Sequence, residues 1–318
     1  MGRIKTFMLM AALTALLMVI GQLVGGNQGM IMAFVFAGAA NFFAYWNSDK
    51  MVLAKTNAKE INADSAPALF NMVRDLADNA QIPMPKIYIV SSPQPNAFAT
   101  GRDPNHAAIA VNTGLMDTLT QDELAGVIAH EMAHIKYRDT LTMTVTATMA
   151  GALTMIARWA MFFGSSNRDN RSGGGGAIAA ILSMILAPIA AALIQFAVSR
   201  TREYEADKHG AQICGHPLWL AGALEKIGLQ SNRIVNEYAE RNPEIASLFI
   251  VNPLRGGKID NLFATHPALE NRIQRLHQMA KNEMNIDESP MAARPQQKRA
   301  SPRVNDKDLT APGNESPW

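Results

Sequence analysis

His130-Glu131-Met132-Ala133-His134 is the stretch of this 318-residue chain that carries the clearest chemical pattern. On an α-helix, residues four positions apart lie on one face, so His130 and His134 can offer imidazole nitrogens to one metal ion. Glu131 lies about 100° further round the helix, where its carboxylate can act as general base for an attacking water. The spacing predicts a helix that carries half of a zinc site and the base for hydrolysis.

The residues before this stretch predict where its helix begins. Thr120 and Glu123 form a capping box, and Asp122 and Glu123 place negative charge in the first turn. Apolar residues then recur at helical spacing, at Leu124, Val127, Ile128 and Ile135. We therefore expect the helix to begin at about Gln121. The alternative is that both histidines are ordinary polar residues on a surface helix.

Composition limits the class of protein. Hydrophobic residues make up 48% of the chain and charged residues only 18%, which is compatible with a membrane protein. A net charge of +2 gives no reason to expect nucleic acid, and no phosphate-binding loop predicts a nucleotide. Cys214 is the only cysteine, so an intrachain disulfide and a cysteine-rich zinc site are excluded.

The N-terminal segment, residues 1–47, is predicted to form a transmembrane hairpin. Ile4–Val24 and Met30–Trp46 are apolar runs separated only by Gly25–Gly29. A cleaved signal peptide is the alternative for the first run, but a second run follows almost at once. The connecting loop is uncharged, so the flanking basic residues place both ends of the hairpin in the cytoplasm: Arg3, Lys5, Lys50 and Lys55.

Residues 140–199 are predicted to form a second apolar hairpin. Thr140–Phe163 is apolar except for Arg158, and Ala177–Ser199 is apolar throughout, with a glycine-rich connector between them. We expect these runs to be the third and fourth transmembrane helices. The alternative is a buried helical hairpin that packs against the cytosolic part of the protein.

Residues 48–139 are expected to form the first part of a cytosolic domain, with a small sheet before the zinc helix. A helical face at Leu69–Leu76 ends at Gln81–Pro85, and three strands are predicted at Lys86–Val90, Asn96–Ala99 and Ala107–Asn112.

An exposed sheet edge beside a metal can hold a peptide by main-chain hydrogen bonds. We therefore take Asn96, Ala97 and Phe98 as candidate substrate-binding residues. The alternative is that this stretch is an ordinary buried strand.

The missing zinc ligand is predicted just after the fourth apolar run. Catalytic zinc sites usually take three protein ligands, and the charged stretch that ends this run offers carboxylates on the same side of the membrane as the histidines. Glu203 and Asp207 are four apart, which suggests Glu203 on zinc and Asp207 holding a ligand imidazole. Glu205 points elsewhere and is expected at the surface. Alternatively, these carboxylates simply pair with Arg200, Arg202 and Lys208.

Together these motifs resemble the HtpX family of bacterial heat-shock membrane zinc metalloproteases, which is related to the CAAX prenyl proteases. The matching motifs are Asn96-Ala-Phe-Ala-Thr-Gly101, the His130–His134 stretch and Ser199-Arg-Thr-Arg-Glu-Tyr-Glu-Ala-Asp207. The resemblance implies one Zn²⁺ per chain with Glu203 as third ligand. It also implies proteolysis of misfolded membrane proteins in stress-related quality control, at the cytoplasmic face of the inner membrane.

The C-terminal part supplies one further candidate. Residues 200–287 are expected to complete the cytosolic domain, with helices at Leu218–Leu229 and Pro267–Ala280. In the family, the histidine equivalent to His266 is thought to hydrogen-bond the tetrahedral intermediate. A helix-capping loop histidine is the alternative. Residues 288–318 are rich in proline and polar side chains, so we expect a disordered tail.

The sequence therefore predicts a mainly α-helical membrane protein with four transmembrane helices and a cytosolic α+β domain like that of zincins. The expected activity is zinc-dependent endopeptidase cleavage of protein or peptide substrates beside the lipid bilayer. Three alternatives compete with it. An intramembrane protease would place the motif inside a span, a zinc transporter would carry polar ligands along its spans, and a scaffold or chaperone would not need Glu131.

Overall fold

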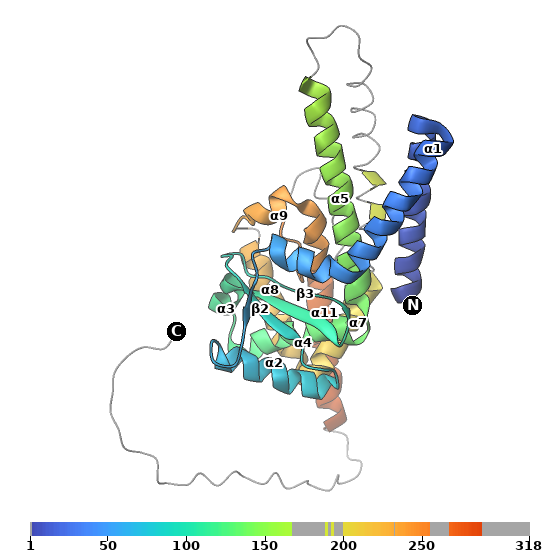
Figure 1. Cartoon of the computed structure of the whole chain (residues 1–318). Coiled ribbons are helices and arrows are strands. Elements are labelled where there is room, and N and C mark those ends of the chain that lie inside the picture. Colours follow the sequence, from blue (N-terminus) through green and yellow to red (C-terminus); the bar gives the residue numbers. More distant parts are fainter. Residues whose placement is uncertain are drawn as a thin grey trace.

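The computed structural model describes residues 2–166, 188, 189, 192, 193, 200–231, 233–254 and 267–287. Helices make up most of these residues, and one four-stranded sheet lies among them (Figure 1). The elements in chain order are α1 (Gly2–Lys55), β1 (Lys59–Ile61), α2 (Pro67–Ala80), β2 (Lys86–Val90), β3 (Ala97–Asp103), β4 (His106–Asn112), α3 (Thr113–Thr118), α4 (Gln121–Lys136), α5 (Asp139–Ser166), α7 (Arg200–Cys214), α8 (Pro217–Ser231), α9 (Glu237–Arg241), η1 (Pro243–Leu248) and α11 (Leu269–Asp287).

The element α1 is two helices joined by a sharp kink. Gly25 and Gly26 leave helical geometry, and Gly26 has a φ of 59°, a conformation that glycine adopts without steric cost. The helix resumes directly after this pair, so the connection is shorter than the predicted loop Gly25–Gly29. Two stretches of α1, Thr6–Leu23 and Gly25–Lys55, are long and apolar enough to cross a membrane.

The first half of α5 is enclosed by protein. Every residue from Thr140 to Ala147 is buried, and this half contacts α1, β3 and η1. Buried threonines link the layers, since the hydroxyl oxygens of Thr142 and Thr6 lie 3.0 Å apart and those of Thr144 and Thr100 3.1 Å apart. This half of the predicted third span is packed as the buried-helix alternative requires. The side chains after Met155 and most of the predicted span at 177–199 lie outside the described residues.

The sheet has the strand order β1-β2-β4-β3. The predicted strand Lys86–Val90 is confirmed, and β4 begins one residue before the predicted Ala107–Asn112. β3 begins at Ala97, one residue after the predicted start at Asn96, and runs on to Asp103, whereas β1 was not predicted. β2 and β4 are parallel, and the outer pairs are antiparallel, so β3 is an edge strand. One face packs on α2 and α4, and the other on α5 and the end of α1.

The helix α4 is the centre of the larger hydrophobic core. It begins at Gln121 with the predicted capping box, in which the Thr120 hydroxyl accepts from the Glu123 N–H and the Glu123 carboxylate accepts from the Thr120 N–H. Every residue from Leu124 to Ile135 is buried, because α2, α7, α8 and β3 surround the helix. The surface-helix alternative for the two histidines is therefore wrong.

The close approach of α7 to α4 depends on Gly210. A Cβ at this position would lie 2.8 Å from Cα and 2.9 Å from N of His130, a separation that real Cβ atoms do not show. These backbone atoms cannot move aside as the end of a flexible side chain can. A hydrogen side chain at residue 210 therefore sets how near α7 and its carboxylates come to the histidines.

We predict that Gly210→Ala destabilises the protein by about 1–3 kcal/mol, because the new methyl group forces α7 away from α4. The same displacement should weaken metal binding by the residues that α7 and α4 share. Urea unfolding and metal titration measure the two effects. Gly38→Ala is the matched control, since nothing lies within 4 Å of a Cβ added there. Equal stability of the two variants would contradict this account of the helix contact.

Candidate metal centre

Three side chains from two helices converge inside the protein. His130 and His134 extend from α4 and Glu203 from α7, and one ligand atom of each lies within 4.8 Å of the other two. The Nε2 atom of His130 is 3.9 Å from Oε2 of Glu203, and the Nε2 atom of His134 is 3.6 Å from Oε1. The structure thus brings together the three residues that the sequence singled out as ligands.

These separations fit a small tetrahedral cation. Zinc–nitrogen and zinc–oxygen bonds of about 2.0–2.2 Å place neighbouring ligand atoms about 3.3–3.6 Å apart in a tetrahedron. The two nitrogen–oxygen distances are close to that range, and Nε2 of His130 is a buried nitrogen with no hydrogen-bond partner among the described residues. A divalent cation between these atoms would be the partner that a buried nitrogen needs in place of water.

The other imidazole nitrogens face carboxylates. Nδ1 of His130 is 3.0 Å from Oδ1 of Asp207, and Nδ1 of His134 is 3.5 Å from Oδ2 of Asp139. A carboxylate at Nδ1 selects the tautomer with the proton on that nitrogen and leaves Nε2 as an electron-pair donor. Asp207 was predicted for this role, whereas Asp139 was not. Asp139 is the first residue of α5 and is also paired with Arg202, with 2.9 Å between Nη1 and Oδ1.

Arg272 is a second site residue, after Asp139, that the sequence did not predict. It extends from α11, is only 1% exposed, and donates to both carboxylate oxygens of Asp207, at 2.9 Å from Nε and 2.7 Å from Nη2. Its Nη1 donates to the carbonyl of Ile250 at 2.8 Å and lies 3.8 Å from Oε2 of Glu203. The sequence did contain a sign that Arg272 has a buried partner, because this residue interrupts the apolar helix face that Leu269 and Leu276 define.

Burial and neighbouring charges shift the ionisation of the site. Burial and, to a smaller extent, the charge of Glu203 raise the pKa of Glu131 to about 7, against the opposing effects of His134 and of the Ala99 N–H. Burial also lowers the pKa of His130 to about 4, although Asp207 opposes that effect. Burial opposes charge at Asp207 too, but the Arg272 guanidinium outweighs it and holds the pKa of that carboxyl below its usual value.

The net charge of this buried group favours a dication. Glu131, Glu203 and Asp207 are each at most 3% exposed, as is Arg272. If all four are ionised and both histidines are neutral, as metal ligands are, three carboxylates and one guanidinium sum to a charge of −2. Burial opposes a charge on His134, but Asp139 and Glu203 outweigh it and raise the pKa of this imidazole to about 9, so a proton there offsets part of the charge when no metal is bound. Uncompensated charge in a protein interior is costly, and a divalent ion held by two histidines and a glutamate would balance it.

Of the remaining predicted residues, four can be placed and one cannot. Glu205 is exposed and lies 3.6 Å from His209, away from the cluster, as expected. Asn96, like its strand neighbours Ala97 and Phe98, is buried, so this stretch of the sheet edge is not open to solvent. The prediction for His266 falls outside the described residues.

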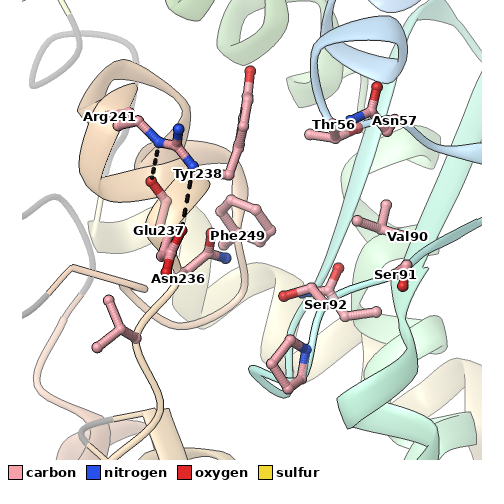
Figure 2. Close-up of a pocket in the computed structure, with 13 residues that line it drawn as sticks. Thr56, Asn57, Val90, Ser91, Ser92, Asn236, Glu237, Tyr238, Arg241 and Phe249 are labelled. Atoms are coloured by element: carbon pink, nitrogen blue, oxygen red, sulfur yellow. Dashed lines mark hydrogen bonds and ion pairs between the residues drawn. The ribbon is translucent and has the colours of Figure 1, made fainter.

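A cavity of about 420 Å³ lies between the carboxyl end of β2 and the segment around α9. Figure 2 shows α9 and Phe249 on one wall and the chain from Val90 to Ser92 on the other. Glu237 and Arg241 form an ion pair on the α9 wall at 3.3 Å. No metal-ligating residue named above lines this cavity.

The family model of "Peptidase family M48" matches residues 63–280, a range that includes α4, α7 and α11. The chain belongs to peptidase family M48. Peptidases of this family are metal-dependent, which agrees with the grouping of His130, His134 and Glu203. Among solved structures, the chain is similar to Ste24p of S. mikatae, with 19% identity, a TM-score of 0.40, and coverage of 81% of this chain and 67% of that one.

We predict that Glu203→Ala abolishes stoichiometric metal binding, because the centre loses its only carboxylate ligand. Elemental analysis of the purified protein after dialysis measures bound metal per chain. Glu205→Ala is the matched control on the same helix and should retain the metal, since its side chain faces away from the cluster. Full metal content in Glu203→Ala, or equal loss in both variants, would exclude Glu203 as the ligand.

Proposed function

We propose that this M48 peptidase is a membrane-anchored zinc endopeptidase, with His130, His134 and Glu203 as the zinc ligands and Glu131 as the general base. The observation that carries the proposal is the buried cluster of these ligands, with Glu131 in the same turn of α4. Asp207 and Asp139 orient the two imidazoles from behind. Two nitrogens and one carboxylate oxygen are the donor set of many catalytic zinc sites.

In this mechanism the residues of the chain place and move protons around the scissile bond. Zinc, when bound, polarises the scissile carbonyl and makes water a stronger nucleophile. Glu131 takes the proton of the attacking water and passes it to the leaving amine, and a carboxyl whose pKa is raised to about 7 is well matched to both steps. His266 is proposed, on the family resemblance alone, to hydrogen-bond the tetrahedral intermediate.

The proposed substrates are protein segments close to the bilayer. The large apolar side chains of α1 are mostly exposed, with Phe34, Val35 and Phe36 each more than half exposed, as a lipid-facing helix requires. Trp46 lies near the end of the second apolar stretch, with the guanidinium of Arg102 from β3 4.7 Å from its ring centre. Tryptophan and arginine are typical of the membrane–water interface.

The finer features of the proposal concern orientation and biological role. We place the catalytic domain and both ends of the chain on the cytoplasmic side of the inner membrane, on the charge pattern around the first hairpin. Removal of misfolded or damaged membrane proteins is the proposed task. The domain would be built from residues 48–139 and 200–287, with 140–199 as a second apolar hairpin between them.

We predict that Glu131→Gln retains wild-type zinc content but loses at least 100-fold in the rate of casein cleavage, because glutamine cannot accept the proton of water. Zinc is measured by elemental analysis and cleavage by release of labelled peptides from the full-length protein in detergent. Glu205→Gln is the control and should keep both properties. A scaffold or chaperone would show no chelator-sensitive cleavage at all, and cleavage at the wild-type rate by Glu131→Gln would refute the proposed base.

A further inference from the structure

The metal cluster is closed off from solvent in this structure. His130, Glu131, His134 and Glu203 are each at most 4% exposed. An extended polypeptide has to reach these side chains for its bond to be cut, so part of the protein that covers them must move. The contacts of the edge strand β3 identify the segment of the protein that a substrate would have to replace.

The outward-facing groups of β3 follow from its register with β4. Phe98 pairs with Ala110, and the N–H of Asn112 donates to the carbonyl of Asn96, so the main-chain groups of residues 96 and 98 face the sheet. In an antiparallel strand these groups alternate in direction. The main-chain groups of Ala97 and Ala99 therefore face away from β4, where a substrate strand would pair.

The protein's own chain already pairs with both of these residues. The carbonyl of Ala97 accepts from the N–H of Ile250 at 3.2 Å. The N–H of Ala99 donates to the carboxylate of Glu131, the proposed general base. The N–H of Ala97 donates to Oδ1 of Asn96 at 3.2 Å. A peptide that pairs with this edge would replace the N–H of Ile250 with one of its own and take the Ala99 N–H away from Glu131.

Phe249–Pro253, which we call the covering segment, is held over the edge by further contacts. The amide of Asn96 donates to the Val251 carbonyl at 2.8 Å, and its oxygen accepts from the Val251 N–H at 3.4 Å. The Phe249 ring packs edge-on against Phe98, with 5.3 Å between ring centres. The covering segment thus follows the edge by paired main-chain and amide bonds, as an added strand does.

The covering segment is also connected to the metal cluster. Arg272, which holds Asp207 behind His130, donates to the carbonyl of Ile250 at 2.8 Å. At the far end of the covering segment, Gln94 donates to the carbonyl of Pro253 at 3.0 Å. These contacts place the covering segment between the sheet edge and the residues that support the metal ligands.

We propose that the covering segment is an internal substitute for substrate: it occupies the edge of β3 at rest, and a substrate strand displaces it. This inference rests on the proposed peptidase function and adds the regulation of its site. Substrate pairing would also free Glu131 from Ala99, so the base becomes available when a peptide is in place. Extended, unfolded segments that form several main-chain bonds are the class of substrate able to make this exchange.

The cavity gives the covering segment space to move. Phe249 lines it on one side, and Val90, Ser91 and Ser92 line it on the other (Figure 2). Protein interiors are close-packed, so a segment can leave its place without disturbing the core only where such space exists. Movement of Phe249 into this cavity is the displacement that the proposal requires, and α4 with its histidines can stay in position.

The test compares two substitutions at one buried position in full-length, zinc-loaded protein. Ile250→Pro removes the N–H that the Ala97 carbonyl accepts, whereas Ile250→Val keeps it and changes the side chain by one methylene group. Loss of one hydrogen bond that competes with substrate should lower KM for casein about twofold to tenfold in Ile250→Pro, with kcat unchanged. Ile250→Val should retain the wild-type KM. An unchanged or raised KM in folded Ile250→Pro would overturn the proposal.

Hydrogen exchange on zinc-loaded Glu131→Gln protein tests the same proposal without a substitution in the covering segment. Saturating casein should increase exchange of the amides of Ile250 and Val251 at least tenfold, while the amides of Ala97 and Ala99 stay protected. If wild-type protein cleaves casein but exchange at Ile250 and Val251 does not rise, the covering segment is not displaced and this inference alone fails. Absence of cleavage by the wild-type protein would instead refute the proposed function.

Discussion

The pairing of buried carboxylates with the imidazoles of α4 is the constraint on which this structure depends. His130 and His134 lie on a helix with no solvent-facing side over its last three turns, so every polar atom there needs a partner from another element. Asp207 and Glu203 come from α7 and Asp139 from the start of α5. The separate helices are therefore held in register by one electrostatic cluster as well as by apolar packing.

Packing and electrostatics support each other in this arrangement. Gly210 allows α7 to approach the backbone of His130, and that approach brings Glu203 and Asp207 to the two imidazole rings. Arg272 then holds Asp207 in place and offsets part of the negative charge. The same guanidinium binds the Ile250 carbonyl, so the support of the metal ligands and the cover over the sheet edge share one side chain.

The sequence predicted the features that depend on short-range patterns. The capping box at Thr120, the start of α4, the strand Lys86–Val90 and the grouping of Glu203 with both histidines are all present. These follow from spacing along a helix or alternation along a strand, which a linear sequence contains directly. The depth of burial of α4 was harder to predict from the sequence, because it depends on how many other helices surround that element.

Long-range pairings account for what the sequence could not supply. Arg272 belongs to the site through a contact with a residue 65 positions earlier, and nothing local to α11 names Asp207 as its partner. The bond between Ile250 and Ala97 likewise joins an irregular segment to a strand far away in the chain. The sequence also could not show that protein encloses the first half of α5, because an apolar run has the same composition whether lipid or protein covers it.

The central claim is that one zinc ion is held by two histidines and one carboxylate. X-ray absorption at the zinc edge of the purified full-length protein tests it most directly. The account predicts one zinc per chain, a first shell of nitrogen and oxygen only at about 2.0–2.2 Å, and outer-shell scattering from two imidazoles. Sulfur at about 2.3 Å, or a first shell without imidazole scattering, would contradict it.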